Sequence, residues 1–194
     1  ESRRRRWLLV CLIVFLALVP LPVGSNRPAF AALAIILLGI CGAGFFGAAA
    51  LDRRHYVGAL PDPVLTAMYG LVCLILFVQV IPMSIPGFTQ TLPGGADLRT
   101  LSFAPGMTLG MLVQMLGYGL FALLVVQISV RTHAAQTLLT AAFAIAVAYA
   151  ALGLVMLTQW GDSYFGLPKE YYLGSATGPF VNRNSFATFL AMGL

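Results

Sequence analysis

Asn182, Arg183 and Asn184 stand together where a polar stretch gives way to an apolar run near the end of the chain. An arginine guanidinium is always charged and offers a planar fork of donors to phosphate oxygens. Asn184 or Ser185 is expected to cap the helix that follows, and the first turn of a helix also favours an anion. These residues therefore predict a phosphate or diphosphate site at Arg183, with Asn182 and Asn184 orienting the arginine or binding sugar hydroxyls.

The alternative for these residues is purely structural. Arginines at the ends of membrane helices commonly reach out to the lipid headgroups. Asparagines commonly form turns and helix caps without any ligand. The residues alone leave both hypotheses open.

Other reactive groups are sparse in the sequence. The apolar runs contain no Asp or Glu, and no Gly-rich nucleotide loop or His-rich metal constellation occurs. The three cysteines lie inside apolar runs, where they act as small apolar fillers. We therefore expect no cofactor and no metal ion.

Composition identifies the class of protein that must position Arg183. The chain has 194 residues, of which 60% are hydrophobic and only 9% are charged, with a formal net charge of +5. A soluble globular chain is about one quarter charged, and a helix that crosses a bilayer needs about 20 mostly apolar residues. The sequence predicts an all-α polytopic membrane protein. Its basic residues lie in loops between the apolar runs and form no stripe, so no nucleic acid is expected as a partner.

Five transmembrane helices are predicted, and the start of a sixth follows near Ser185. The five cover approximately residues 7–23, 29–51, 63–83, 108–130 and 134–158, with longer loops at residues 84–107 and 159–182. Pro20 and Pro22 are expected to end the first helix. The chain begins without Met and stops at Leu194 inside an apolar run, which indicates the N-terminal part of a longer protein.

Basic residues between the runs predict the orientation in the membrane. Most of the 11 basic residues lie in one set of alternate loops, as Arg3, Arg4, Arg5, Arg6, Arg53, Arg54 and Arg131. The other set contains Arg27, Arg99, Lys169 and Arg183. The richer set is expected to be cytoplasmic, so the N-terminus lies inside and residues 182–184 lie outside. Four aromatic residues suit an interfacial belt on that outer face: Trp160, Tyr164, Tyr171 and Tyr172.

A wider motif around Arg183 resembles the start of the core domain of the O-antigen ligase and O-antigen polymerase family. It reads Gly178-Pro179-Phe180-Val181-Asn182-Arg183-Asn184-Ser185-Phe186-Ala187, followed by Phe189-Leu190-Ala191-Met192-Gly193-Leu194. The family shows a similar pattern at an outward-facing helix start, with a histidine frequent where Ser185 stands. The ending Gln79-Val80-Ile81-Pro82-Met83 is also similar to the outer end of a family helix.

The resemblance implies a larger helical bundle of the lipid-carrier-dependent glycosyltransferase type in a bacterial inner membrane. Such an enzyme transfers a glycan from undecaprenyl diphosphate to a periplasmic acceptor, which is lipid A–core in ligases and a growing glycan in polymerases. Residues 1–177 would form the N-terminal transmembrane helices, and residues 178–194 the truncated start of the core domain. Arg183, Asn182 and Asn184 would bind the diphosphate and glycan. Catalytic residues are expected beyond Leu194, and the fragment alone would be inactive.

A membrane transporter or flippase for a lipid-linked or anionic substrate is the alternative function. Proton-coupled transporters usually carry acidic or histidine residues inside the membrane. The apolar runs of this chain lack such carboxylates, which argues against an ion-driven pump. A non-catalytic membrane scaffold is a third hypothesis.

Overall fold

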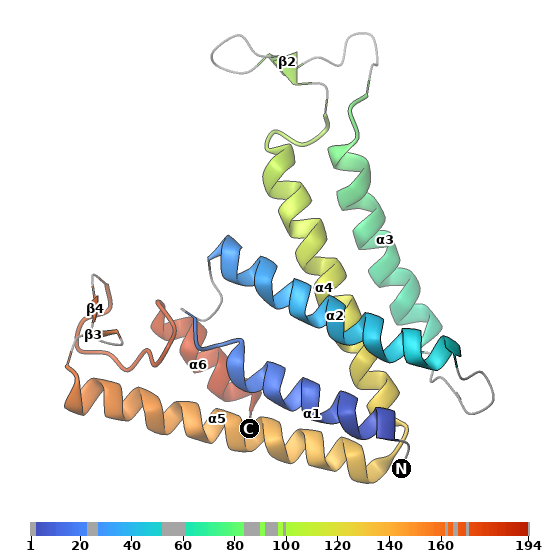
Figure 1. Cartoon of the computed structure of the whole chain (residues 1–194). Helices are drawn as coiled ribbons and strands as arrows, with labels where there is room; N and C mark the ends of the chain where they lie inside the picture. Colours follow the sequence, from blue (N-terminus) through green and yellow to red (C-terminus); the bar gives the residue numbers. More distant parts are fainter. Residues whose placement is uncertain are drawn as a thin grey trace. The chain divides into compact units, whose positions relative to one another are not determined.

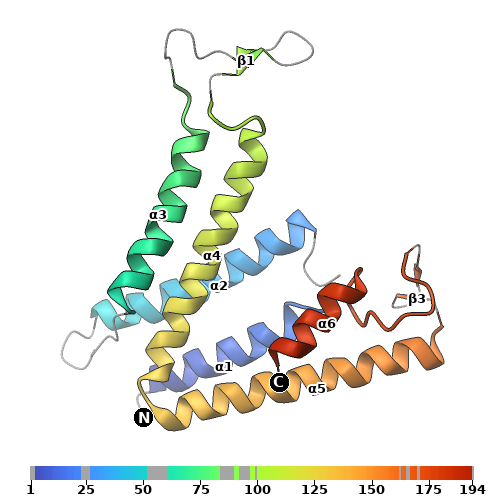
Figure 2. The same cartoon turned by 180° about the vertical axis from the view of Figure 1, so that it is seen from behind.

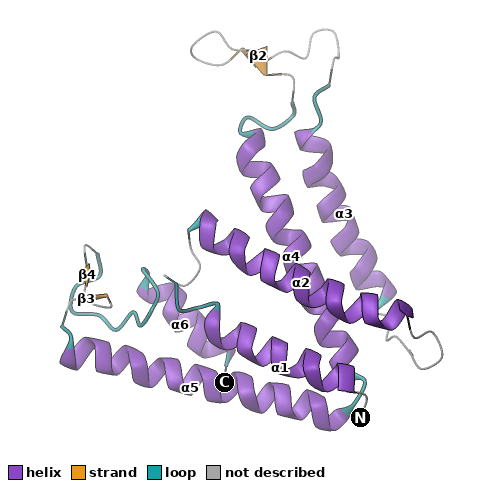
Figure 3. Ribbon diagram, in the orientation of Figure 1, coloured by secondary structure: helices purple, strands orange, loops and turns teal. Residues whose placement is uncertain are grey.

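The computed structural model describes residues 3–22, 27–51, 61–83, 90–91, 97–98, 100–161, 163–164, 167–169 and 171–193. Within these residues the fold is helical (Figure 1), and the helices are α1 (Arg3–Leu18), α2 (Pro28–Leu51), α3 (Pro63–Val80), α4 (Pro105–Ser129), α5 (Thr132–Gln159) and α6 (Arg183–Met192). Two antiparallel pairs of two-residue strands lie in the connections (Figure 3). They are β1 (Gln90–Thr91) with β2 (Asp97–Leu98), and β3 (Ser163–Tyr164) with β4 (Leu167–Pro168).

Four of the described helices, α2 to α5, are long and apolar enough to cross a bilayer. The most apolar 18-residue stretch of each helix has a mean hydropathy between 2.1 and 2.4. In α3, no residue of that stretch is buried against the rest of the protein. Apolar side chains left this exposed are stable against lipid rather than water. The prediction of a helical membrane protein is therefore confirmed.

The predicted count of five spans plus the start of a sixth is not confirmed. The first predicted span, residues 7–23, is replaced by α1, which starts within the arginine run and ends at Leu18 after 16 residues. It is not among the four candidate spans. The described part of α6 is 10 residues long.

Prolines explain most of the corrected helix boundaries. α3 ends at Val80 rather than Met83, because Ile81 precedes Pro82 and adopts an extended conformation with φ −66° and ψ 127°. α4 starts at Pro105 rather than residue 108, since proline fits the first helical position. α5 extends slightly beyond the predicted residues 134–158 at both ends.

The chain divides into two compact units. One contains Glu1–Val57 and Gln127–Leu194, and the other contains Gly58–Val126. In the second unit, the Asp62 side chain caps α3 by accepting hydrogen bonds from the N–H groups of Val64 and Leu65, each at 2.9 Å. The Tyr69 hydroxyl donates to the Met115 carbonyl and so joins α3 to α4.

The first unit is built on the long helix α5. α1 lies alongside α5 in both views (Figures 1 and 2), and its Leu8 and Leu12 are fully buried. The Tyr149 hydroxyl of α5 donates a 2.6 Å hydrogen bond to the Ala17 carbonyl. The last carbonyls of a helix have no partner inside the helix, so this bond fixes the end of α1 to α5. α6 also packs on α5, which makes α5 the support of the candidate site.

Candidate functional site

Asn182 forms the cap at the start of α6. Its backbone is extended, with φ −110° and ψ 127°, and its side-chain oxygen accepts a 2.8 Å hydrogen bond from the Asn184 N–H. Its carbonyl accepts the first helical bond, from the Phe186 N–H at 3.1 Å. The expectation that Asn184 or Ser185 is the cap was therefore wrong, because the helix begins earlier, at Arg183. A cap of this kind stabilises a helix by about 1 kcal/mol.

Arg183 is the first residue of α6, and its side chain is exposed. Its guanidinium carbon lies 5.8 Å from the centroid of the Tyr172 ring, which is a cation–π contact. Tyr172 has φ +58°, a left-handed conformation that bulky side chains rarely adopt. Strained residues of this kind concentrate at functional sites, so the Tyr172 conformation marks the surroundings of Arg183 as a candidate site.

The loop that carries Tyr172 is held by a second basic residue. Lys169 Nζ donates a 3.1 Å hydrogen bond to the Ser175 carbonyl, and the Ser175 N–H lies 3.3 Å from the Tyr172 carbonyl that accepts its hydrogen bond. Lys169 and Arg183 thus contact the same short turn, residues 172–175. The turn is therefore contacted by two basic side chains, and one of them, Arg183, stands at the positive end of the α6 dipole.

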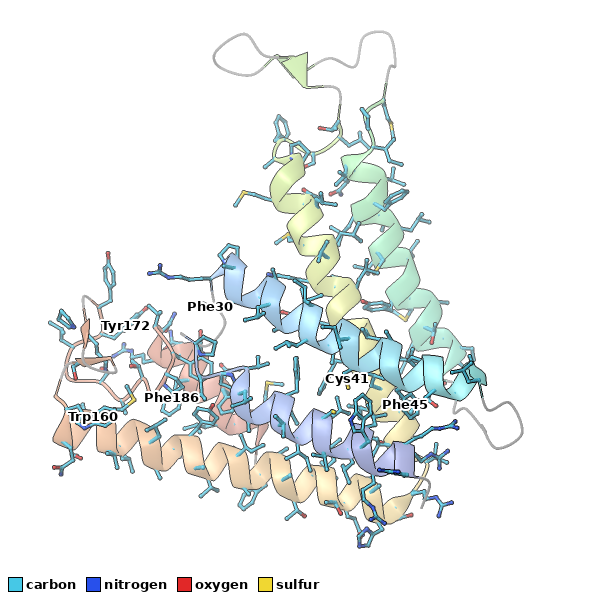
Figure 4. The ribbon with its side chains drawn as sticks, viewed as in Figure 1. Phe30, Cys41, Phe45, Trp160, Tyr172 and Phe186 are labelled. Carbon is cyan, nitrogen blue, oxygen red and sulfur yellow. The ribbon has the colours of Figure 1, made fainter. Side chains whose placement is uncertain are left out.

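The apolar residues of the motif attach the start of α6 to α5. Gly178 has φ +51° and is buried, and a Cβ atom added there would lie 2.8 Å from the Phe186 ring. A Cβ atom added at Gly153 of α5 would lie 2.7 Å from the same ring. The two glycines therefore form a slot that the Phe186 ring fills. Phe186, labelled in Figure 4, is 5% exposed.

An aromatic cluster continues this packing along α6. The Phe180 ring lies 5.7 Å from Phe186 and 5.2 Å from Phe189, measured between centroids. Phe189 meets the Tyr149 ring edge-to-face at 5.4 Å. The same Tyr149 holds the end of α1, so one packed cluster connects three helices.

Thr177 is a buried polar residue beside the motif. Its side chain is 1% exposed, and its hydroxyl oxygen has no hydrogen-bond partner among the described residues. An unsatisfied buried hydroxyl costs about 1–3 kcal/mol.

The three predicted site residues lie together at the start of α6. Asn182 is half-buried and its side-chain oxygen caps α6, whereas Arg183 and Asn184 are exposed. Tyr172 is predicted from the sequence to belong to an aromatic belt, and no spacing signal in the sequence pairs it with Arg183. Three of the arginines used for the orientation prediction lie outside the described residues: Arg53, Arg54 and Arg99.

Within the described part of the chain, no group of three or more His, Cys, Asp or Glu residues could hold a metal ion. The exposed charge at the start of α6 is that of Arg183, whose guanidinium carries only hydrogen-bond donors and therefore suits an anion.

Comparison with known proteins gives no family assignment. No protein-family model, no curated protein and no solved structure matches this chain. The function is therefore argued from the geometry at α6 together with the motif resemblance.

Proposed function

We propose that this chain is part of a glycan ligase or polymerase of the bacterial inner membrane. The enzyme transfers a glycan from undecaprenyl diphosphate to a periplasmic acceptor, either lipid A–core or a growing glycan, during assembly of surface polysaccharide. One observation carries the proposal: the first residue of an asparagine-capped helix is an exposed arginine oriented by a tyrosine ring. That arrangement is suited to a diphosphate.

The electrostatics of the α6 start favour an anion with two phosphates. The Asn182 side chain accepts the hydrogen bond of the Asn184 N–H. The N–H groups of Arg183 and Ser185 also belong to the first turn of α6, where no helical carbonyl precedes them to accept a hydrogen bond. The helix dipole adds about half a positive charge at the same end. Arg183 supplies two parallel donors, and Lys169 supplies a second full charge on the adjoining turn.

The proposed reaction is a single displacement at the glycan's anomeric carbon. The acceptor hydroxyl oxygen forms a bond to this carbon, and its proton passes to a general base. The bond from the same carbon to the diphosphate oxygen breaks, and its electron pair leaves with undecaprenyl diphosphate. Negative charge therefore grows on the diphosphate in the transition state, where the Arg183 guanidinium stabilises it.

The donor requirement tests this proposal. Full-length protein in liposomes is supplied with acceptor and with one glycan linked either to undecaprenyl diphosphate or to undecaprenyl monophosphate. Transfer from the monophosphate is expected to be at least about 100-fold slower, because the poorer leaving group also makes fewer contacts with the arginine. Equal rates from both donors would contradict the diphosphate role. Movement of the donor across the bilayer without any transfer would favour a flippase.

The orientation of the chain is a second testable part of the proposal. Reporter fusions after His133 and after Lys169 should report opposite sides of the membrane, because α5 lies between them. The His133 fusion is expected in the cytoplasm and the Lys169 fusion in the periplasm, following the distribution of arginines. A cytoplasmic signal from the Lys169 fusion would put Arg183 on the wrong side for a periplasmic acceptor.

A further inference from the structure

An apolar groove of about 480 Å³ runs between α1 and α2. Its walls include Trp7 at one end, Phe15 and Leu37 along its length, and Pro22 and Phe30 at the other end. Phe30 and Cys41 mark the α2 side of the groove in Figure 4. A volume of this size is typical of sites that take an extended small molecule.

The two helices of the groove run in opposite directions. Trp7, at the start of α1, lies over Gly44 near the end of α2, where a Cβ atom would be 3.2 Å from the indole. Residues 7–18 of α1 extend roughly 16 Å at 1.5 Å per residue. One leaflet of a bilayer core is about 15 Å deep. The helical wall of the groove formed by residues 7–18 therefore matches the depth of one leaflet, which one lipid acyl chain fills.

Four positively charged residues stand next to one end of the groove and would favour a lipid with a negatively charged headgroup. Arg3, Arg4, Arg5 and Arg6 form the first turn of α1 and directly precede Trp7. Positive side chains at a helix N-terminus oppose the helix dipole, and that turn contains no acidic residue. An anion at this end would offset both the dipole and the arginine charges. Clusters of basic residues at a membrane surface attract anionic lipids in the same way.

We propose that the groove between α1 and α2 binds an anionic phospholipid of the surrounding bilayer. One acyl chain lies along the groove from Trp7 toward Pro22, and the phosphate headgroup lies among the four arginines. This role is separate from glycan transfer at Arg183.

Quenching of Trp7 fluorescence by lipids with brominated acyl chains tests the proposal. Full-length protein is placed in phosphatidylcholine vesicles that contain a low, equal fraction of brominated phosphatidylglycerol or brominated phosphatidylcholine. The Trp7 signal is the difference between the parent and its Trp7→Phe variant. Brominated phosphatidylglycerol is expected to quench this signal at an at least about fivefold lower fraction. The Trp160 signal, obtained in the same way with Trp160→Phe, should show no such preference.

Two groove variants separate specific from general lipid contact. Ala34→Phe fills the groove and should abolish the preference, whereas Ala32→Phe on the same helix faces away from it and should retain the preference. Replacing all four arginines with glutamine should equalise the two lipids. Equal quenching by both lipids in the parent protein would overturn the proposal. Absence of quenching would also overturn it, since another protein segment would then occupy the groove.

Discussion

Replacing Arg183 with alanine is expected to lower the rate of glycan transfer by about 10²–10³-fold, the usual cost of losing one donor to transition-state charge. The Arg183 side chain is exposed and its only described contact is the Tyr172 ring, so its removal should leave the fold intact. The measurement is transfer in liposomes at equal membrane levels of each variant.

Two further variants make this result specific. Arg183→Lys keeps the charge but loses the planar fork and the stacking on Tyr172, so transfer should fall by an intermediate factor. Arg27→Ala removes another exposed arginine, just before α2, and should leave transfer unchanged. If Arg183→Ala and Arg183→Lys both transferred glycan at the parent rate, Arg183 would be an interfacial anchor and the proposed site would be wrong.

Gly178→Ala is expected to destabilise the first unit by roughly 2–4 kcal/mol. The left-handed backbone at φ +51° costs about 1 kcal/mol for a residue with a Cβ atom, and the contact with the Phe186 ring adds an overpacking cost of about 1–3 kcal/mol. Thermal unfolding in detergent measures the effect. The start of α6 should also become more accessible to protease.

Other glycines serve as matched controls for Gly178. Gly161 shares a positive φ, +60°, but has nothing within 4 Å of an added Cβ atom, so Gly161→Ala should show only the backbone cost. Gly153→Ala should show mainly the clash with Phe186, and Phe186→Leu in the same chain should relieve part of it. Gly39→Ala meets no neighbour and should be neutral or slightly stabilising. A Gly178→Ala melting temperature equal to that of Gly39→Ala would contradict the slot.

Hydrophobic runs predicted α2, α3, α4 and α5 well, because a segment that must satisfy its backbone inside lipid can only be helical. They failed for α1, where a helix runs through the arginines and stops before Pro20. Hydropathy shows where a segment is apolar, but it does not show where a helix begins. A helix extends into any neighbouring residue that tolerates helical dihedral angles, and arginine does so easily.

The site was only partly predictable. Asn182, Arg183 and Asn184 are contiguous, so their meeting at one helix start follows from the sequence. The Tyr172 contact depends on a left-handed backbone and on a turn held by Lys169, neither of which leaves a periodic pattern. Likewise, the sequence places Phe186 at the start of the predicted sixth helix, but its slot between Gly153 and Gly178 depends on a contact with α5 that only the folded chain creates.

The antiparallel packing of α6 on α5 sets how deep Arg183 lies at the membrane surface. Phe186 faces Gly153, and Gly193 faces Ala146, so the start of α6 is level with a point on α5 before its end at Gln159. Phe186 is level with Gly153, so Arg183, three residues earlier on α6, is level with a position three residues after Gly153 on α5. That position is three residues before Gln159, which puts the arginine backbone roughly 5 Å below the end of α5 at 1.5 Å per residue. If α5 crosses the bilayer as proposed and ends at its surface, a charge at that depth is expected in the headgroup layer rather than in bulk water, where lower polarity would strengthen its attraction to a diphosphate. A lipid-linked donor could then reach the arginine without lifting its phosphates out of the bilayer surface.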